Sequence, residues 1–487
     1  MAKVTTGRTT KTRSGGIPRP NISDPEMKRT LDAIISHLEL KDGQRGETLD
    51  KAVTFRELDE PVSAKVAESV TPVSNTLNIL LKNEYVVQPG MTAQQTEGAI
   101  LAALNTIAAV QNGGTILFKN GTYNTSNPVV IDTDGVSLIG RDSTEWWNDD
   151  ATGDVIQLGT TNHRVVDGSI KNIFFLPNVA KTAGAVISAH VGQYLFEDIK
   201  AVGWGASNHF YNGLWFIGDR DNPSATGNGG QWEIYLRRLR LQNGGYGWNG
   251  ITFTDHCFDV TGQWFLLGGW SHAVAIPHAE AIDLSYLETT AMLDNDFQIE
   301  PDSSISQHVD NCHFTRCVPD WGYGHGFHFG GSGTIRTTTL DQCWAGSHGM
   351  VPGTGALSAQ KNAVDCTAAN LQGLYIKNSY FSWNAAHGIY VNAGSDIEIS
   401  GCHVLSNSVW GSGSYPGIYI GNTPRTVRIM NNRAGGRMWA ANNQSYGIFV
   451  AASCDDFMIV GNHTLGNVTG GINYPSGAAT KLVANNL

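Results

Sequence analysis

Carboxylates are densest between Glu280 and Asp302, so this is where acid–base chemistry is easiest to build in the 487-residue chain. Cleavage of a glycosidic bond uses two carboxyl groups, one as general acid and one as base or nucleophile. The C-terminal part of the chain contains a repeat, described below, that indicates stacked coils. If the same coil spacing holds here, acids near 255 lie about one coil from acids near 280. The same acids would also suit a solvated surface loop, and that alternative stays open. The predicted catalytic carboxylates are Asp255, Asp259, Glu280 and Asp283.

A polysaccharide lyase would need different groups, namely a His or Tyr base and a cation that stabilises the enolate. His256, Tyr246 and Arg220 could fill these roles, although no motif joins them. The sequence therefore leaves hydrolase and lyase chemistry open, and with them the question of whether the chain is an enzyme.

Histidines gather between residues 308 and 348, around the segment Trp321–Phe329. A zinc site needs three or four fixed ligands, and His325-x-x-His328 alone would supply two. In a strand, Phe327 would face one side and His328 the other, which favours an ordinary stacked strand. We predict no metal site and no cofactor.

Thirteen tryptophans are many for this length, and several lie in glycine-rich segments. Aromatic faces pack on the C–H groups of sugars while neighbouring polar groups bind the hydroxyls. About half of the tryptophans are expected in the core, because tryptophan is highly buried on average. The predicted sugar-binding residues are Trp215, Asp219, Arg220, Tyr246, Trp248, Trp264, Trp270 and Trp321.

Short strands that recur along the C-terminal part must hold these residues in place. One strand type alternates apolar and polar residues, at 374–376, 397–399, 427–429 and 457–459. A second type opens with Gly-Ile, at positions 388, 417, 447 and 471. Two interleaved series with similar steps indicate one coil that is repeated, with parallel strands stacked from coil to coil. Asparagines that follow the first strand can adopt turn geometry and stack in ladders; they are Asn378, Asn431, Asn432 and Asn462.

The predicted fold class is therefore all-β, a single-stranded right-handed parallel β-helix with a short helical adaptor at its N-terminal side. Residues 1–20 are predicted to be a flexible basic arm, and residues 21–88 a helical adaptor and linker. The β-helix is assigned to residues 89–487, with a cap helix at 92–110 that covers the first coil. Met27, Leu31, Ile34 and Leu38 would form either a short coiled-coil seam or an ordinary helix packed on its own domain.

The net charge of the whole chain is −11, and the body is more negative still, because the first twenty residues contain basic residues and no acid. An acidic body does not attract nucleic acid. The seven cysteines form no CxxC pair and are expected to be small core residues. No membrane span and no signal peptide are predicted, so synthesis in the cytoplasm is expected.

The segment from Thr92 to Asp142 resembles the opening coils of the pectate-lyase-like superfamily of β-helix proteins, which includes many bacteriophage tailspikes. The resemblance is carried by the alanine-rich helix and by GGTILF, NGTY and VSLIG, and it extends more weakly to residue 487. Family members often show GxxxDGxTDDT before the helix, where this chain has Gly90-Met-Thr-Ala-Gln-Gln-Thr96. Residues 19–39 and 50–58 resemble virion-attachment segments of phages and gene transfer agents.

The resemblance implies a virion spike, anchored to a virion structural protein through residues 1–60 and acting as a homotrimer. Such a spike would bind a bacterial surface polysaccharide, as a receptor-binding protein, through the irregular coils between about residues 200 and 330. One alternative is a depolymerase, a glycoside hydrolase or lyase that acts on capsule or lipopolysaccharide. Another is a structural virion adaptor.

Overall fold

The computed structural model describes residues 84–487, except 111–112, 161–162, 219–232, 352–353, 422, 437–442 and 455. The predicted arm, adaptor helix and attachment segment therefore lie outside the described residues, and so do Asp219 and Arg220. The domain boundary at residue 89 stays a prediction. The first described strand, β1 at Glu84–Val87, already pairs with β2, so the described β-helix begins a few residues before that boundary.

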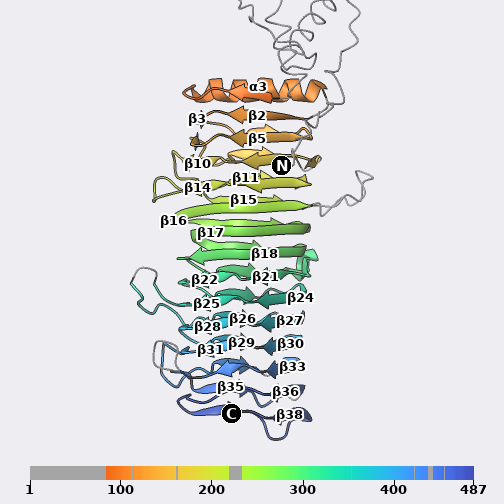
Figure 1. The fold of residues 1–487 in the computed structure, drawn as a ribbon, viewed down its shortest axis with the longest axis vertical. Helices are drawn as coiled ribbons and strands as arrows, with labels where there is room; N and C mark the ends of the chain where they lie inside the picture. The colour runs from red at the N-terminus through yellow and green to blue at the C-terminus, as the bar shows by residue number, and fades with distance from the viewer. Residues whose placement is uncertain are drawn as a thin grey trace, which may run out of the picture. The chain divides into compact units, whose positions relative to one another are not determined.

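The described strands form a right-handed parallel β-helix of about 14 turns, as predicted. Each coil contributes strands to three stacks, which we call A, B and C in chain order, and each strand pairs in parallel with its counterparts in the adjacent coils (Figure 1). Three long strands run through more than one stack before the chain turns; they are β16 (Ile234–Thr254), β17 (Cys257–Ile276) and β18 (Ala279–Thr290).

The remaining strands fall into the stacks as follows. Stack A contains β1, β2 (Gly114–Phe118), β5 (Val136–Gly140), β9 (Ser169–Lys171), β13 (Tyr194–Glu197), β20 (His308–Asp310), β21 (His313–Thr315), β24 (Thr334–Asp341), β27 (Leu371–Lys377), β30 (Ser395–Ser400), β33 (Arg425–Met430), β36 (Asp456–Val460) and β38 (Thr480–Ala484). Stack B contains β3 (Gly121–Thr125), β6 (Thr144–Asn148), β10 (Phe174–Pro177), β14 (Lys200–Val202), β22 (Val318–Asp320), β25 (Trp344–Gly346), β28 (Tyr380–Ser382), β31 (His403–Leu405) and β34 (Arg433–Ala434). Stack C contains β4 (Val129–Ile131), β7 (Ile156–Leu158), β11 (Ala185–Ala189), β15 (Asn212–Ile217), β19 (Phe297–Ile299), β23 (Phe327–Phe329), β26 (Val364–Cys366), β29 (Ile389–Val391), β32 (Ile418–Ile420), β35 (Tyr446–Val450) and β37 (Gly470–Asn473). Outside the stacks, β8 (Val165–Val166) pairs with β12 (Val191–Gly192), and a 3-10 turn, η2, covers Ser303–Ile305.

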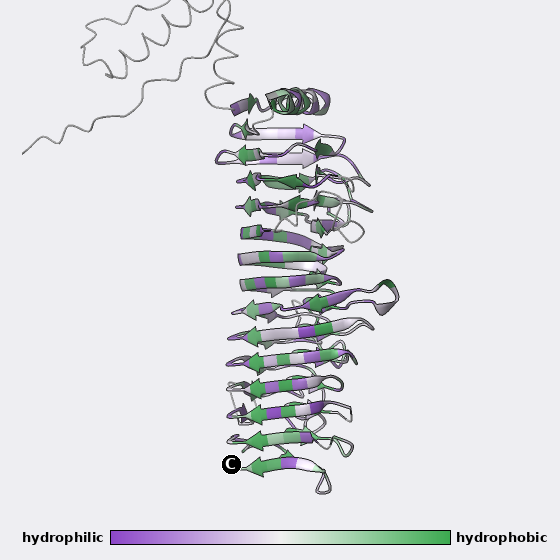
Figure 2. Cartoon of the chain, turned by 90° about the vertical axis from the view of Figure 1, so that its right-hand side faces the viewer, coloured by the Kyte–Doolittle hydropathy of each residue, from purple (hydrophilic) through white to green (hydrophobic). Residues whose placement is uncertain are grey.

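The core consists of inward rows in which the same strand position is apolar in every coil. In stack A, Ile376, Ile399, Ile429 and Ile459 lie in register and are fully buried. Side chains alternate between the two faces of a strand, so each inward residue is flanked by outward ones, and bands of hydrophobic and hydrophilic residues cross the strands (Figure 2). All seven cysteines are buried with free thiols, as expected for core residues.

The bend between stacks A and B places one residue per coil in the left-handed region, with φ between 50° and 71°. Strand pairing before and after the bend keeps these residues in register, and we call them the bend column. Asparagine tolerates this conformation, which explains the predicted asparagine turns. From β9 to β38 the bend column is Asn172, Asp198, Arg238, Trp264, Tyr286, Arg316, Gln342, Asn378, Gly401, Asn431, Gly461 and Asn485.

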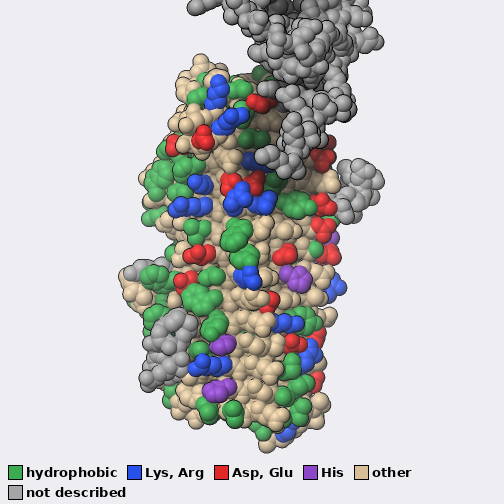
Figure 3. All heavy atoms as spheres, in the orientation of Figure 1, with side chains coloured by type: hydrophobic (Ala, Val, Ile, Leu, Met, Phe, Trp, Pro, Cys, Tyr) green, Lys and Arg blue, Asp and Glu red, His purple; other side chains and the backbone are tan. Residues whose placement is uncertain are grey.

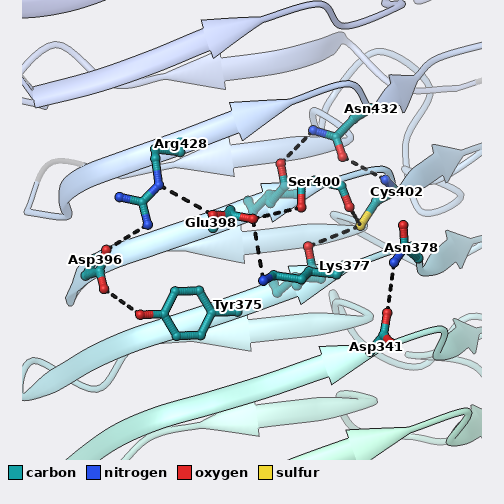
Figure 4. A network of polar contacts seen from close by, with 12 residues as sticks. Asp341, Tyr375, Lys377, Asn378, Asp396, Glu398, Ser400, Cys402, Arg428 and Asn432 are labelled. Atoms are coloured by element: carbon teal, nitrogen blue, oxygen red, sulfur yellow. Dashed lines mark hydrogen bonds and ion pairs between the residues drawn. The ribbon is translucent and has the colours of Figure 1, made fainter.

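Polar ladders tie the C-terminal coils together inside and outside (Figure 4). Inside, the Asn432 side chain donates to Asn462 Oδ1 at 3.0 Å and accepts from the Cys402 backbone at 2.8 Å, as predicted for stacked asparagines. Outside, Arg428 bridges Asp396 at 2.9 Å and Glu398 at 3.5 Å on stack A. The strands of these coils recur in register and form a regular scaffold.

Helix α3 (Ala93–Val110) covers the first coil, as the cap prediction required. Ile100, Ala103, Leu104 and Ile107 are buried at helical spacing against the first strands. Among the described residues, no helix combines the length and the apolar character that a membrane span needs.

Candidate functional site

The most unusual outward surface is a row on stack C, formed by the central residues of six consecutive strands. Strand pairing aligns each residue with the next, so the row is continuous over five strand spacings, roughly 24 Å. Its first half is polar and its second half is aromatic. We call it the C row; it consists of Gln298, His328, Asp365, Tyr390, Tyr419 and Phe449.

In the polar half, His328 lies between two carboxylates. Its Nε2 is 2.8 Å from Glu300 Oε1 and its Nδ1 is 2.8 Å from Asp365 Oδ2. Asp365 is also held by Asn362, whose amide donates to Oδ1 at 2.7 Å. The His328 and Asp365 side chains are mostly buried, whereas Glu300 is 36% exposed. Of these three residues, Glu300 is therefore the one that a ligand can reach.

Burial alone would lower the pKa of His328, but its hydrogen bonds to Asp365 and Glu300 outweigh burial and raise the pKa to about 9. At neutral pH the ring is an imidazolium that donates from both nitrogens. The hydrogen bond from His328 lowers the pKa of Glu300, because its effect is larger than that of burial, which would raise the pKa. Burial opposes ionisation of Asp365, yet His328 still lowers its pKa. The arrangement is a fixed carboxylate–imidazolium–carboxylate group with no protonated carboxyl.

Two further histidines border this group. Burial lowers the pKa of His325 to about 4, so this ring is neutral, and its Nδ1 accepts from the Asn362 backbone at 3.0 Å. His272 contacts Asn249 at 2.9 Å and lies 3.5 Å from the Asp294 carboxylate, which is half exposed. The polar half of the C row thus offers several fixed donors and acceptors beside solvent.

The aromatic half continues directly from Asp365. Tyr390 and Tyr419 stack at 5.1 Å between ring centroids with an interplanar angle of 11°, and Tyr419 and Phe449 stack at 5.5 Å and 4°. The three rings are partly exposed. A row of aromatic surface beside fixed polar groups is the arrangement by which proteins hold sugar chains.

A second candidate surface lies on the other side of the coils, where the bend column meets stack B. A surface pocket of about 450 Å³, which we call the bend pocket, is lined by bend-column residues and by residues of stack B. Glu288 is exposed in this pocket. Asp320 lies one coil further and two residues along, on the same outward face, because Glu288 pairs with Val318 and Thr290 pairs with Asp320. Burial and the nearby Glu288 raise the pKa of Asp320 to about 6.

Two groups of side chains among the described residues bring metal-ligating atoms within 4.8 Å of one another. In the group of His325, His328 and Asp365, the histidine nitrogens already make the contacts given above. In the group of His256, His278 and His308, the first two rings are parallel, at 8° and 4.9 Å. The nitrogen lone pairs of each ring lie in its plane, and two parallel planes share no point at which both lone pairs could meet an ion. These two rings therefore do not converge on an ion as they are placed.

The four predicted catalytic carboxylates lie around the turn between stacks C and A and on stack A. Strand pairing sets Glu280 opposite Phe258 and Asp283 opposite Thr261, so Asp259 is one position out of register with Glu280 and two with Asp283. Glu280 Oε2 instead lies 3.6 Å from His256 Nε2, which joins two groups predicted for different mechanisms. The predicted pairing of these carboxylates with one another stays a prediction.

The predicted aromatic residues are dispersed. Trp215 is in register with Thr252, in the line of outward positions that leads to the C row, and Trp264 lines the bend pocket. Tyr246 and Trp248 are half exposed between the stack B and stack C parts of β16, and Trp321 lies at a turn. Trp270 is fully buried and donates to the Leu241 carbonyl at 3.1 Å, so its ring packs the core rather than facing a ligand.

Reasoning from the sequence missed the C row and the Glu288–Asp320 pair. The prediction that Phe327 and His328 face opposite sides is confirmed, but it was taken to indicate an ordinary strand. The signal was the middle residue of each apolar–X–apolar triplet, read in order along the chain. These middle residues change from Gln, His and Asp to Tyr, Tyr and Phe.

The stacked coils and their outward rows define a right-handed parallel β-helix protein. The family model described as "Right handed beta helix region" matches residues 296–487. The A-module of the mannuronan C-5 epimerase AlgE6 of Azotobacter vinelandii is similar in structure, with 14% identity, a TM-score of 0.50, and coverage of 83% of this chain and 96% of the module. Tailspike protein 3 of bacteriophage CBA120 is similar with 12% identity, a TM-score of 0.52, and coverage of 96% of this chain and 69% of the tailspike.

No curated protein matches this chain in sequence. At 12–14% identity, the likeness to the epimerase module and the tailspike is a likeness of fold. The resemblance to β-helix proteins inferred from the sequence is thereby confirmed. What the chain binds must be argued from its own side chains.

Proposed function

We propose that this protein is a virion spike that binds a host cell-surface polysaccharide along the C row. The observation that carries the proposal is the continuity of the row. Three stacked aromatic rings lead in register to the Glu300–His328–Asp365 group. A sugar chain lying across the coils would meet apolar ring surface at one end and fixed hydrogen-bonding groups at the other.

The virion role has two supports. The tailspike of bacteriophage CBA120 is similar in fold, with coverage of 96% of this chain, and residues 19–39 and 50–58 resemble virion-attachment segments. Detection of the chain in purified phage or gene transfer agent particles, with a variant lacking residues 1–60 as comparison, tests this role. The proposed homotrimer is tested by the mass in solution, which should be three times the 52.4 kDa of the chain.

Replacing Tyr419 with Ala is expected to weaken polysaccharide binding about tenfold, which corresponds to ~1.4 kcal/mol. The middle ring of the stack would be lost, and the sugar chain would span a gap. Binding is measured by biolayer interferometry against arrayed capsular polysaccharides and O-antigens. Tyr235→Ala is the matched control, because Tyr235 is 44% exposed on stack A, away from the C row. Equal affinity of the Tyr419 variant and the wild type would contradict a role of the C row.

A second candidate function is depolymerisation, and the Glu288–Asp320 pair favours it. The two residues are diagonal neighbours on adjacent strands, with Cα atoms roughly 8 Å apart by strand geometry. The pKa of about 6 leaves Asp320 partly protonated near neutral pH, as a general acid requires. Glu288 would act as the base or nucleophile, according to the separation of the carboxyl groups.

If the chain hydrolyses its polysaccharide at this pair, Asp320→Asn and Glu288→Gln are each expected to lower the rate at least about a hundredfold. The wild-type rate should fall above about pH 6, where Asp320 loses its proton. Release of reducing ends measures hydrolysis, and absorbance of unsaturated uronates would reveal a lyase instead. Glu280→Gln and Asp283→Asn are assayed in parallel, since a loss in these two variants alone would place cleavage at the carboxylates predicted from the sequence.

A further inference from the structure

The bend column changes character in the middle of the β-helix. Seven of its twelve members are Asn, Asp or Gly, the residues that adopt the left-handed conformation most easily. The other five occupy consecutive coils. They are Arg238, Trp264, Tyr286, Arg316 and Gln342.

Two of these five, Trp264 and Tyr286, are bulky aromatic residues with φ values of 64° and 54°. A residue with a side chain loses about 1–2 kcal/mol in this conformation, and a bulky residue there is an outlier. The inward neighbours Phe265 and Leu287 would keep their places whichever residue occupied the bend. The fold therefore gives no reason for Trp or Tyr at these positions, and strained residues of this kind cluster at functional sites.

The side chains of the strained residues form one ordered stack on the surface. Trp264 and Tyr286 are parallel at 4.3 Å between centroids and 12°, and Trp264 is 55% exposed. The Arg316 guanidinium lies 5.1 Å from the centroid of the Tyr286 ring and donates to its hydroxyl. Hydrophobic side chains lie between basic ones near the middle of this face, at the level of β17 and β18 (Figure 3).

The two arginines of the bend pocket differ in whether they form ion pairs. Arg238 is held by Asp198 at 2.7 Å and by Glu197 at 2.8 Å. Arg316, by contrast, has no carboxylate at ion-pair distance among the described residues, and its Nε donates to Gln342 at 2.9 Å. Glu288 is exposed in the same pocket, in register between the apolar residues Leu266 and Val318 of the adjacent strands. A free donor, a free acceptor and apolar side chains on either side of the acceptor match the hydroxyls and C–H face of a sugar.

We propose that Trp264, Tyr286 and Arg316 form a second saccharide site, which holds one neutral sugar unit in the bend pocket against Leu266 and Val318. Arg316 donates to one hydroxyl and Glu288 accepts from another. An acidic sugar fits less well, because its carboxylate would lie beside Glu288. The inference rests on the proposed function only for the class of ligand, since this pocket lies on stack B and not on the C row.

The test replaces each strained aromatic with Asn, the residue that other coils use at the same position. Trp264→Asn and Tyr286→Asn are expected to keep or raise the unfolding temperature while weakening saccharide binding at least tenfold. Saturation-transfer NMR measures binding of methyl α-glucoside, galactoside, mannoside and glucuronide. Trp383→Asn is the matched control, because Trp383 is also left-handed (φ 63°) and 41% exposed but lies outside the pocket.

A lower unfolding temperature in both Asn variants would show that the rings stabilise the fold, and would overturn the proposal. So would saturation transfer that is unchanged in Trp264→Asn, or that is seen for the glucuronide alone.

The variant Tyr419→Ala distinguishes binding along the C row from binding in the bend pocket. If long-chain polysaccharide binding is lost in that variant but unaffected by Trp264→Asn and Tyr286→Asn, the proposed function stands and this inference fails. If no polysaccharide binds but a neutral glycoside binds in a Trp264-dependent way, the inference stands and the C row fails.

Discussion

Asp365→Asn is expected to lower the pKa of His328 toward its ordinary value and to destabilise the fold by about 2 kcal/mol at neutral pH. Asp365 is mostly buried and receives hydrogen bonds from both His328 and Asn362. An amide at this position has one acceptor oxygen in place of two, so one of these donors is left without its partner. The imidazolium also loses the buried charge that offsets its desolvation.

The sign of the pH dependence follows from the raised pKa of His328. A group whose pKa is raised on folding contributes stability that is complete below its unfolded value, near 6.5, and is lost as the pH rises through its folded value. For His328 the folded value is about 9, so the wild type is expected to lose on the order of 3 kcal/mol between about pH 6.5 and 9. In Asp365→Asn the folded pKa of His328 is lower, so the pH range over which stability is lost ends at a lower pH.

Urea unfolding between pH 6 and 10 measures the stability, and NMR of ¹³C-labelled histidine rings measures the pKa of His328. Asp283→Asn is the control, because Asp283 is exposed on the outer face of β18 and its substitution should leave both measurements unchanged. A His328 pKa near 9 in Asp365→Asn would mean that Glu300 alone holds the imidazolium, and the three-group arrangement would be wrong.

The coils could be predicted from the sequence because the same strand position is buried in each of them. Ile399 and Ile429 recur at the same place in the coil, and each is followed by a bend that requires a left-handed residue. Burial leaves a strong trace in the sequence, since a polar residue in an inward row would lose its hydration. The cap helix was predictable for the same reason, as one apolar face had to cover the first coil.

The candidate site was harder to predict because outward rows depend on register and the turns vary in length. The step from Gln298 to His328 is 30 residues, from His328 to Asp365 it is 37, and from Asp365 to Tyr390 it is 25. Acids that seem to be one coil apart by average spacing can therefore miss each other. Asp259, for example, is one position out of register with Glu280, since Phe258 is the residue opposite Glu280.

Register also explains why aromatic residues of one type have different roles. Trp270 points inward and fills the core, whereas Trp264, six residues earlier on the same strand, lies at the bend and is exposed. Composition and glycine content do not separate these two cases. The conformation of the bend does, because the left-handed position of Trp264 projects its ring away from the coil.

Asp296→Asn is expected to stabilise the protein by a few degrees at pH 8, an unusual direction for a core substitution. Burial raises the pKa of Asp296 well above its ordinary value, and the nearby Asp320 acts in the same direction. Thr289 donates to its Oδ2, while Oδ1 faces His348 Nδ1 at 3.8 Å. Burial also lowers the pKa of His348 to about 3. Both shifts favour the neutral forms of the pair, so we expect folding near neutral pH to place a proton on the aspartate.

An asparagine needs no proton, keeps the shape of the side chain, and can donate to His348 Nδ1 while it accepts from Thr289. Because the pKa of Asp296 is raised on folding, its contribution is complete below the unfolded value and falls as the pH rises. The advantage of Asp296→Asn should therefore be small near pH 4 and grow toward pH 8, as measured by thermal unfolding at each pH. Asp259→Asn, an exposed substitution, should show no such trend. A variant less stable than wild type at pH 8 would mean that the aspartate is ionised in the core, where neither Thr289 nor a neutral His348 could balance its charge.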